Sequence, residues 1–158
     1  MLSFDDFGNL TPYQSTITEW LEIENVFVKS FSNSRNRKHL FERLRANINY
    51  FSENITPHFD CIIDGSFATL KLNPNDVDVV LFIDYQLFEI LENEISKFKS
   101  IAIYDEIDVY VEKKYPENHR YFIRYQTDLL YWNQLFTRNR KKQNKGYLTF
   151  KNHGNAER

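Results

Sequence analysis

The chain has 158 residues and a formal net charge of −2, and 42% of its residues are hydrophobic, including 14 Phe and 10 Tyr. A chain of this length fits one domain with a sizeable core, and its near-neutral charge excludes a globally basic protein of the histone or ribosomal type. We expect an N-terminal arm over residues 1–15, the domain over residues 16–150 and a flexible tail over residues 151–158.

Cysteine content and hydropathy indicate the cellular location of the protein. Cys61 is the single cysteine and lies inside an apolar run, which predicts a buried thiol and excludes a disulfide within one chain. The sequence shows neither a charged-then-apolar leader nor an uninterrupted apolar run approaching 18 residues. We therefore expect a cytoplasmic protein that does not enter a membrane.

Two helices are predicted after the arm. The first begins at Ser15 or Thr16 and ends at about Lys29, because apolar residues recur there at helical spacing. The second opens at Asn33 or Ser34 and carries an apolar stripe on one side and several arginines and lysines on the other. Those cations form either a solvated face or a surface that steers an anionic substrate.

Three strands and a helix follow. The strands are expected at about Phe59–Asp64, Val77–Ile83 and Ile107–Glu112, and the helix after Asp84. The second strand is almost continuously apolar, which is typical of a strand buried on both faces.

The last third of the chain is mixed in character. A loop passes into another strand near Tyr121–Tyr125, and Thr127 caps a helix that continues through Phe136. The basic cluster Arg138–Lys145 comes next, interleaved with aromatic residues. The whole pattern predicts an α/β (α+β) fold with a mixed sheet of three to five strands flanked by helices.

The most informative stretch lies between the first two strands. Gly65-Ser66 ends the first strand, nine residues follow (67–75), and Asp76-Val77-Asp78 opens the second. On one strand these two carboxylates share a face about 6 to 7 Å apart, at roughly 3.3 Å per residue. They repel each other unless a hard divalent cation such as Mg²⁺ or Mn²⁺ lies between them.

The turn itself suits a phosphate group. Gly65 allows close approach of the backbone, Ser66 offers a hydroxyl, and N–H groups exposed after the turn can hold phosphate oxygens. A nucleoside triphosphate (NTP) would bring those oxygens to the metal. Each half also has a plain structural interpretation, the acids as a solvated edge and Gly-Ser as a simple turn.

Together the two halves resemble the signature of the polymerase-β-like nucleotidyltransferase superfamily, a Gly-Ser followed by an aspartate, an apolar residue and a second acid. The longer string 64–78 also resembles a small bacterial group of uncharacterised nucleotidyltransferase-like proteins, as do the opening Phe4–Pro12 and the closing Lys145–Leu148. One departure is Asp64, where the superfamily usually has an apolar residue. Asp64 either hydrogen-bonds the turn or adds negative charge near the metals.

The resemblance implies a third carboxylate on a strand beside the aspartate pair. Asp108 has the right local pattern, and Asp105 and Glu106 are its competitors. In such a site Asp76 and Asp78 hold the metal ions, and Asp108 acts as general base or helps to hold the second metal. The pyrophosphate needs a cation, for which Lys71 and the Arg138–Lys145 cluster are the candidates.

The expected function is therefore transfer of a nucleoside monophosphate from an NTP, such as ATP, to a hydroxyl on protein or on RNA such as tRNA, as a component of a toxin–antitoxin or phage-defence system. The alternative is a catalytically weak antitoxin or regulatory module that docks to a partner protein encoded nearby. A third hypothesis is an RNA-binding protein that uses the Arg138–Lys145 cluster.

Overall fold

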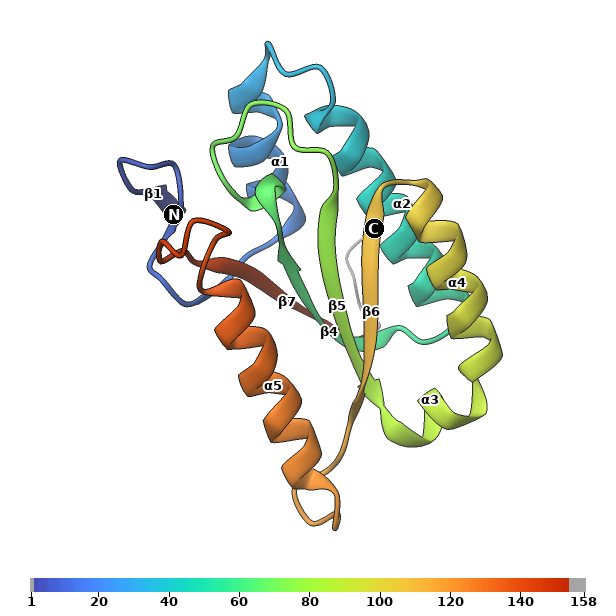
Figure 1. The fold of residues 1–158 in the computed structure, drawn as a ribbon. Helices are drawn as coiled ribbons and strands as arrows, with labels where there is room; N and C mark the ends of the chain where they lie inside the picture. The colour runs from blue at the N-terminus through green and yellow to red at the C-terminus, as the bar shows by residue number, and fades with distance from the viewer. Residues whose placement is uncertain (1, 154–158) are drawn as a thin grey trace.

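The structure is a computed structural model that describes residues 2–153, and its centre is a five-stranded mixed sheet with the strand order β3-β7-β4-β5-β6 (Figure 1). The strands are β3 (Ser15–Ile17), β4 (His58–Asp64), β5 (Val77–Asp84), β6 (Ile107–Lys114) and β7 (Tyr147–His153). Helices flank the sheet, so the predicted α+β fold class is confirmed, and the three predicted strands correspond to β4, β5 and β6.

The sheet is mixed because some of its neighbouring strands run antiparallel and others run parallel. β4 runs antiparallel to both of its neighbours, β5 and β7. β5 and β6 are parallel, and the connection between them holds two helices, α3 (Tyr85–Ile90) and α4 (Glu92–Tyr104). Asp84 caps α3 by accepting hydrogen bonds from the backbone N–H groups of Gln86 and Leu87.

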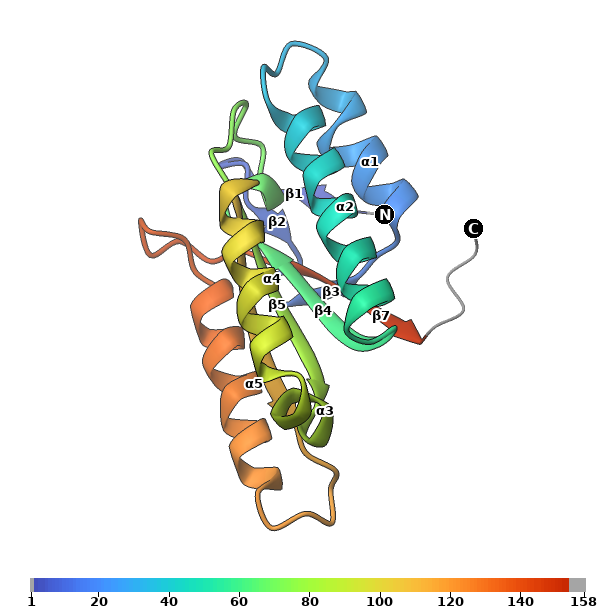
Figure 2. The ribbon, with the colours of Figure 1, turned by 90° about the vertical axis from the view of Figure 1, so that its right-hand side faces the viewer.

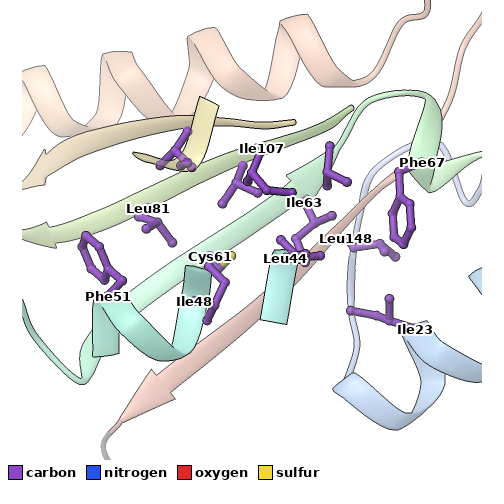
Figure 3. Packing of buried hydrophobic residues seen from close by; sticks show 14 of the residues in the cluster. Ile23, Leu44, Ile48, Phe51, Cys61, Ile63, Phe67, Leu81, Ile107 and Leu148 are labelled. Carbon is purple, nitrogen blue, oxygen red and sulfur yellow. The ribbon is translucent and has the colours of Figure 1, made fainter. Parts of the chain in front are cut away.

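Most of the core lies on one face of the sheet, beneath α1 (Trp20–Phe27), α2 (Arg37–Asn54) and α4 (Figures 2 and 3). Residues that alternate along β4 and β5, such as Cys61, Ile63 and Leu81, point to this face and pack against α2. The predicted burial of Cys61 is confirmed.

The other face is covered by α5 (Phe122–Phe136), which packs on residues of opposite alternation. Ile62, Val80 and Phe82 form a second cluster there with Trp132 and Phe136. α5 thus lies on the opposite side of the sheet from α1 and α2 (Figure 2).

The N-terminal residues form more structure than the sequence predicts. β1 (Ser3–Phe4) pairs with β2 (Leu10–Thr11), and β3 pairs in parallel with β7. The predicted start of the first helix at Ser15 or Thr16 is wrong, because these residues lie in β3 and α1 begins at Trp20. The apolar spacing continues through β3, so periodicity alone places the start too early.

Two predictions near the C-terminus also differ from the structure. The strand expected at Tyr121–Tyr125 belongs mostly to α5, so Thr127 lies inside that helix and caps nothing. β7 extends to His153, so residues 151–153, which the sequence predicts to be part of the flexible tail, lie in a strand, while residues 154–158 lie outside the described residues. Between residues 2 and 153, no helix has both the length and the apolar character needed to span a bilayer.

Candidate nucleotide and metal site

The Gly-Ser turn lies directly after β4. Gly65 adopts a φ of +81°, a conformation that glycine reaches without strain. Ser66 is half-buried and opens the short 3₁₀ helix η2 (Ser66–Ala68), in which the Ala68 N–H donates to the Gly65 carbonyl over 3.3 Å. The predicted strand–turn arrangement is therefore present.

Three carboxylates form a row across neighbouring strands at this end of the sheet. Asp64 of β4 pairs in register with Asp78 of β5, and Asp78 pairs with Asp108 of β6. Paired residues point to the same face, and Ile62, two residues before Asp64, packs beneath α5. Since neighbouring strands lie about 4.8 Å apart, the outer two strands of this carboxylate row are about 10 Å apart.

The Gly-Ser turn lies against the middle of this row. A side chain added at Gly65 would place its Cβ 2.5 Å from Oδ2 of Asp78, closer than any stable contact. Gly65 is therefore required both for its backbone conformation and for this approach. The turn and the second aspartate of the motif meet as the sequence predicts.

Asp76 is placed differently from the prediction that both aspartates lie on one strand. β5 begins at Val77, so Asp76 lies just before it and is exposed, whereas Asp78 is half-buried. The negative charge of Asp76 nevertheless affects Asp78. Burial, and then the nearby carboxylates of Asp76 and Asp108, raise the pKa of Asp78 to about 6, as expected for acids that share a site.

Asp64 forms a buried ion pair, which is its main interaction. The ammonium group of Lys145 lies 2.7 Å from both carboxylate oxygens of Asp64, and both side chains are about 5% exposed or less. Burial raises the pKa of Asp64 against the opposing charge and hydrogen bonds of Lys145, and the net result is a pKa of about 7. One end of the carboxylate row is thus neutralised by the protein itself.

The structure separates the three candidates for the third carboxylate. Asp105 accepts a hydrogen bond from Asn47 of α2 over 2.8 Å, and Glu106 pairs with Arg43 of α2 at 2.9 Å. These two acids are therefore engaged with α2, on the other face of the sheet. Asp108 is the candidate whose register places it beside Asp78.

Tyr110 supports the side chain of Asp108 from the same strand. Its hydroxyl donates to Oδ2 of Asp108 over 3.1 Å, and its ring lies 4.8 Å from that of Trp132 in α5. One carboxylate oxygen of Asp108 is thereby oriented, and α5 holds the tyrosine that orients it.

Lys71 lies in the loop between η2 and β5, with an exposed side chain. The guanidinium group of Arg37 organises this loop. Arg37 is fully buried and donates hydrogen bonds to the backbone carbonyls of Phe27, Phe67, Thr69 and Lys71. Burial lowers its pKa to about 10, so Arg37 stays charged at neutral pH and fixes the loop that carries Lys71.

The donor set suits a hard divalent cation in kind, because Asp76, Asp78 and Asp108 offer carboxylate oxygens from one end of the sheet. Over residues 2–153, however, no group of three His, Cys, Asp or Glu side chains is gathered closely enough to hold an ion. Asp108 lies beside Asp78 on the next strand, and Asp76 lies two residues before Asp78. A bound cation would have to draw them together.

Two residues that matter at the site are not predicted as such from the sequence. Lys145 is included only as part of the basic cluster, and Arg37 only as one cation of the second helix. A charged residue at the end of a buried strand, such as Asp64, does call for a buried cation. The sequence offers 20 lysines and arginines as partners, so it cannot identify Lys145.

Comparison with known proteins places the chain in one family. No curated protein and no solved structure matches it. A family model described as a family of unknown function, DUF6932, matches residues 2–151 and so covers nearly the whole chain. By this match, the protein belongs to the DUF6932 family.

Proposed function

We propose that this protein is a nucleotidyltransferase that moves a nucleoside monophosphate from an NTP to a hydroxyl group on protein or RNA. The observation that supports this most is the contact of Gly65 with Asp78 in a row of in-register carboxylates. A purely structural role gives no reason to hold Asp76, Asp78 and Asp108 close enough to raise a pKa. The resemblance to polymerase-β-like nucleotidyltransferases supplies the reaction class.

Each residue has a distinct task in this reaction. Asp76, Asp78 and Asp108 would hold Mg²⁺ or Mn²⁺, which would neutralise charge that develops on the phosphate oxygens. Gly65 and Ser66 would bind phosphate oxygens through backbone N–H groups and the serine hydroxyl.

Proton transfer falls to Asp108. The acceptor hydroxyl forms a bond to the α-phosphorus, the bond from that phosphorus to the bridging oxygen breaks, and pyrophosphate leaves. Asp108 takes the hydroxyl proton, for which one carboxylate oxygen lies outside its hydrogen bond with Tyr110. A cytoplasmic location would supply both NTP and acceptor.

A labelling experiment tests this function. The protein is incubated with each of the four labelled NTPs, Mg²⁺ or Mn²⁺, and total cell extract, and label is followed into protein and into RNA. Asp78→Asn and Asp76→Asn should each reduce labelling about 10²-fold or more, since each removes a charged metal ligand. Asp6→Asn is the matched control, because it makes the same change at an exposed site in the N-terminal hairpin.

Full activity in both Asp78→Asn and Asp76→Asn would refute the site. Absence of label with any NTP would favour the second candidate function, a docking module. That candidate is supported by the apolar outer surface of α5, where Ile123, Leu130 and Leu135 are 64%, 56% and 48% exposed.

A further inference from the structure

The basic segment between α5 and β7, residues 137–146, is a structured loop, which we call the basic loop. Asn139 organises it by accepting hydrogen bonds from the backbone N–H groups of Lys141 and Gln143 over 2.9 and 3.0 Å. Arg138 and Asn144 form a β-bridge across the loop. The side chain of Asn139 also donates to Asn9 over 3.2 Å, which ties the loop to the N-terminal hairpin.

The same loop is anchored to one end of the carboxylate row. Lys145 is its buried member and pairs with Asp64, the outermost acid of the row. The next residue, Gly146, donates its N–H to the Leu10 carbonyl over 2.6 Å. Figure 1 shows the loop, in orange-red, between α5 and β7 at the end of the sheet that also carries η2.

Four cations of the basic loop face solvent, since Arg138, Arg140, Lys141 and Lys142 are all exposed. The charge of Arg140 reaches Asp78, whose pKa it lowers against the raising effects of burial and of the neighbouring acids. The ion pair of Lys145 with Asp64 thus fixes the loop that carries Arg140 at that end of the carboxylate row.

The opposite end of the row is aromatic. Tyr110, which is hydrogen-bonded to Asp108, is 37% exposed, and Tyr131 of α5 is 56% exposed. Both rings lie within about 5 Å of the Trp132 ring, at 4.8 and 5.0 Å between centroids. Exposed aromatic rings beside a nucleotide site are suited to stack on a base.

We propose that the nucleotide lies along the carboxylate row with its polyphosphate toward the basic loop, where Arg140 contacts the phosphate oxygens, and its base toward Tyr110 and Tyr131. This inference rests on the proposed function and adds the orientation of the nucleotide in the site. It assigns the pyrophosphate cation to Arg140 rather than to Lys71, and it makes Lys145 and Asp64 positioning residues for the loop.

Binding of inorganic tripolyphosphate, which has no base, tests the direction without requiring catalysis. Affinities of tripolyphosphate and of each NTP are measured by calorimetry with Mg²⁺. Arg140→Gln should lower the affinity for both kinds of ligand by about 10-fold or more, which is the loss expected for a charge-assisted hydrogen bond. Tyr131→Ala should leave the affinity for tripolyphosphate unchanged and lower the affinity for the NTP about 5- to 10-fold.

Arg124→Gln on α5 is the matched control, because it removes the same charge from an exposed helix position. Wild-type affinity of Arg140→Gln for tripolyphosphate would overturn the role of the basic loop, and equal weakening of both ligands by Tyr131→Ala would overturn the direction. Failure of the proposed function gives a different result, since the wild-type chain would then bind neither ligand.

Discussion

Asp78 is the residue on which the site depends, and its environment is unusual for a surface acid. It is half-buried between Asp64 and Asp108 in the sheet, and Gly65 lies against its carboxylate. Its position could be predicted from the sequence, because the alternation of Val77, Asp78 and Val79 fixes which side chains face the core. The sequence shows that its neighbour Asp64 is a charged residue at the end of a strand. It does not identify the partner of Asp64, because Lys145 lies 81 residues further along the chain.

The raised pKa of Asp78 predicts a stability that depends on pH. Its pKa is raised from the ordinary 3.8 to about 6 by burial and then by Asp76 and Asp108, so the folded state keeps a proton that the unfolded state has lost. Stability from this group is present below about pH 4 and is lost as the pH rises through 6. Without divalent cations, wild type should lose about 1–3 kcal/mol more than Asp78→Asn between pH 4.5 and 7.5, measured by urea unfolding. Equal losses in the two proteins would contradict this.

The buried pair of Asp64 and Lys145 predicts strong coupling between two substitutions. Lys145→Met leaves the Asp64 carboxylate buried without its cation and should cost about 3–5 kcal/mol of unfolding free energy. The double variant Asp64→Leu with Lys145→Met should regain most of that loss, since two apolar side chains need no neutralisation. Chemical denaturation of both variants measures the coupling. A double variant no more stable than the single one would show that the pair contributes packing rather than charge balance.

At the scale of elements, the strands that carry the site were predictable, while the segments around them were not. β4, β5 and β6 are apolar runs with clear ends, so their bounds follow from the sequence within a few residues. The sequence around Tyr121 wrongly predicts a strand, because aromatic residues favour strands locally. In the structure, Tyr125 and Trp132 instead pack α5 against the sheet.

The loop between η2 and β5 depends on one buried cation from α2, which could not be foreseen. Arg37→Met should leave several loop carbonyls without a donor and cost about 2–4 kcal/mol. Amide hydrogen exchange over residues 67–76 should rise in this variant. Arg35→Met is the control, because its side chain is exposed while its backbone N–H makes the bond to Asn73, and it should change stability by less than about 0.5 kcal/mol. Unchanged exchange in Arg37→Met would show that the loop is held by other contacts.

For the whole molecule, the main surprise is that β7 lies inside the sheet and not beside it. β7 pairs with β3 on one side and with β4 on the other, and its sequence gives only a weak strand signal because only Tyr147 and Leu148 are buried among residues 147–152. A strand of this kind is defined by its partners, which no local pattern reveals.

This central position predicts a large effect of a small change in β7. Leu148 is fully buried in the main core, and Leu148→Ala should cost about 2–5 kcal/mol in chemical denaturation. Lys151→Ala, in the same strand but exposed, should stay within about 0.5 kcal/mol of wild type. Similar losses in the two variants would mean that β7 contributes backbone pairing alone.

The order of the strands also bears on how the chain folds as a ribosome releases it. Within residues 2–153, β3 has β7 as its only sheet partner, and Ser15 pairs with Tyr147 far along the chain. The edge of β4 that β7 covers therefore stays open throughout synthesis of residues 65–146, and β3 waits until residues 147–153 leave the exit tunnel. Such long-range closure slows folding, and the open edge is where nascent chains of this protein would first need protection from pairing with one another.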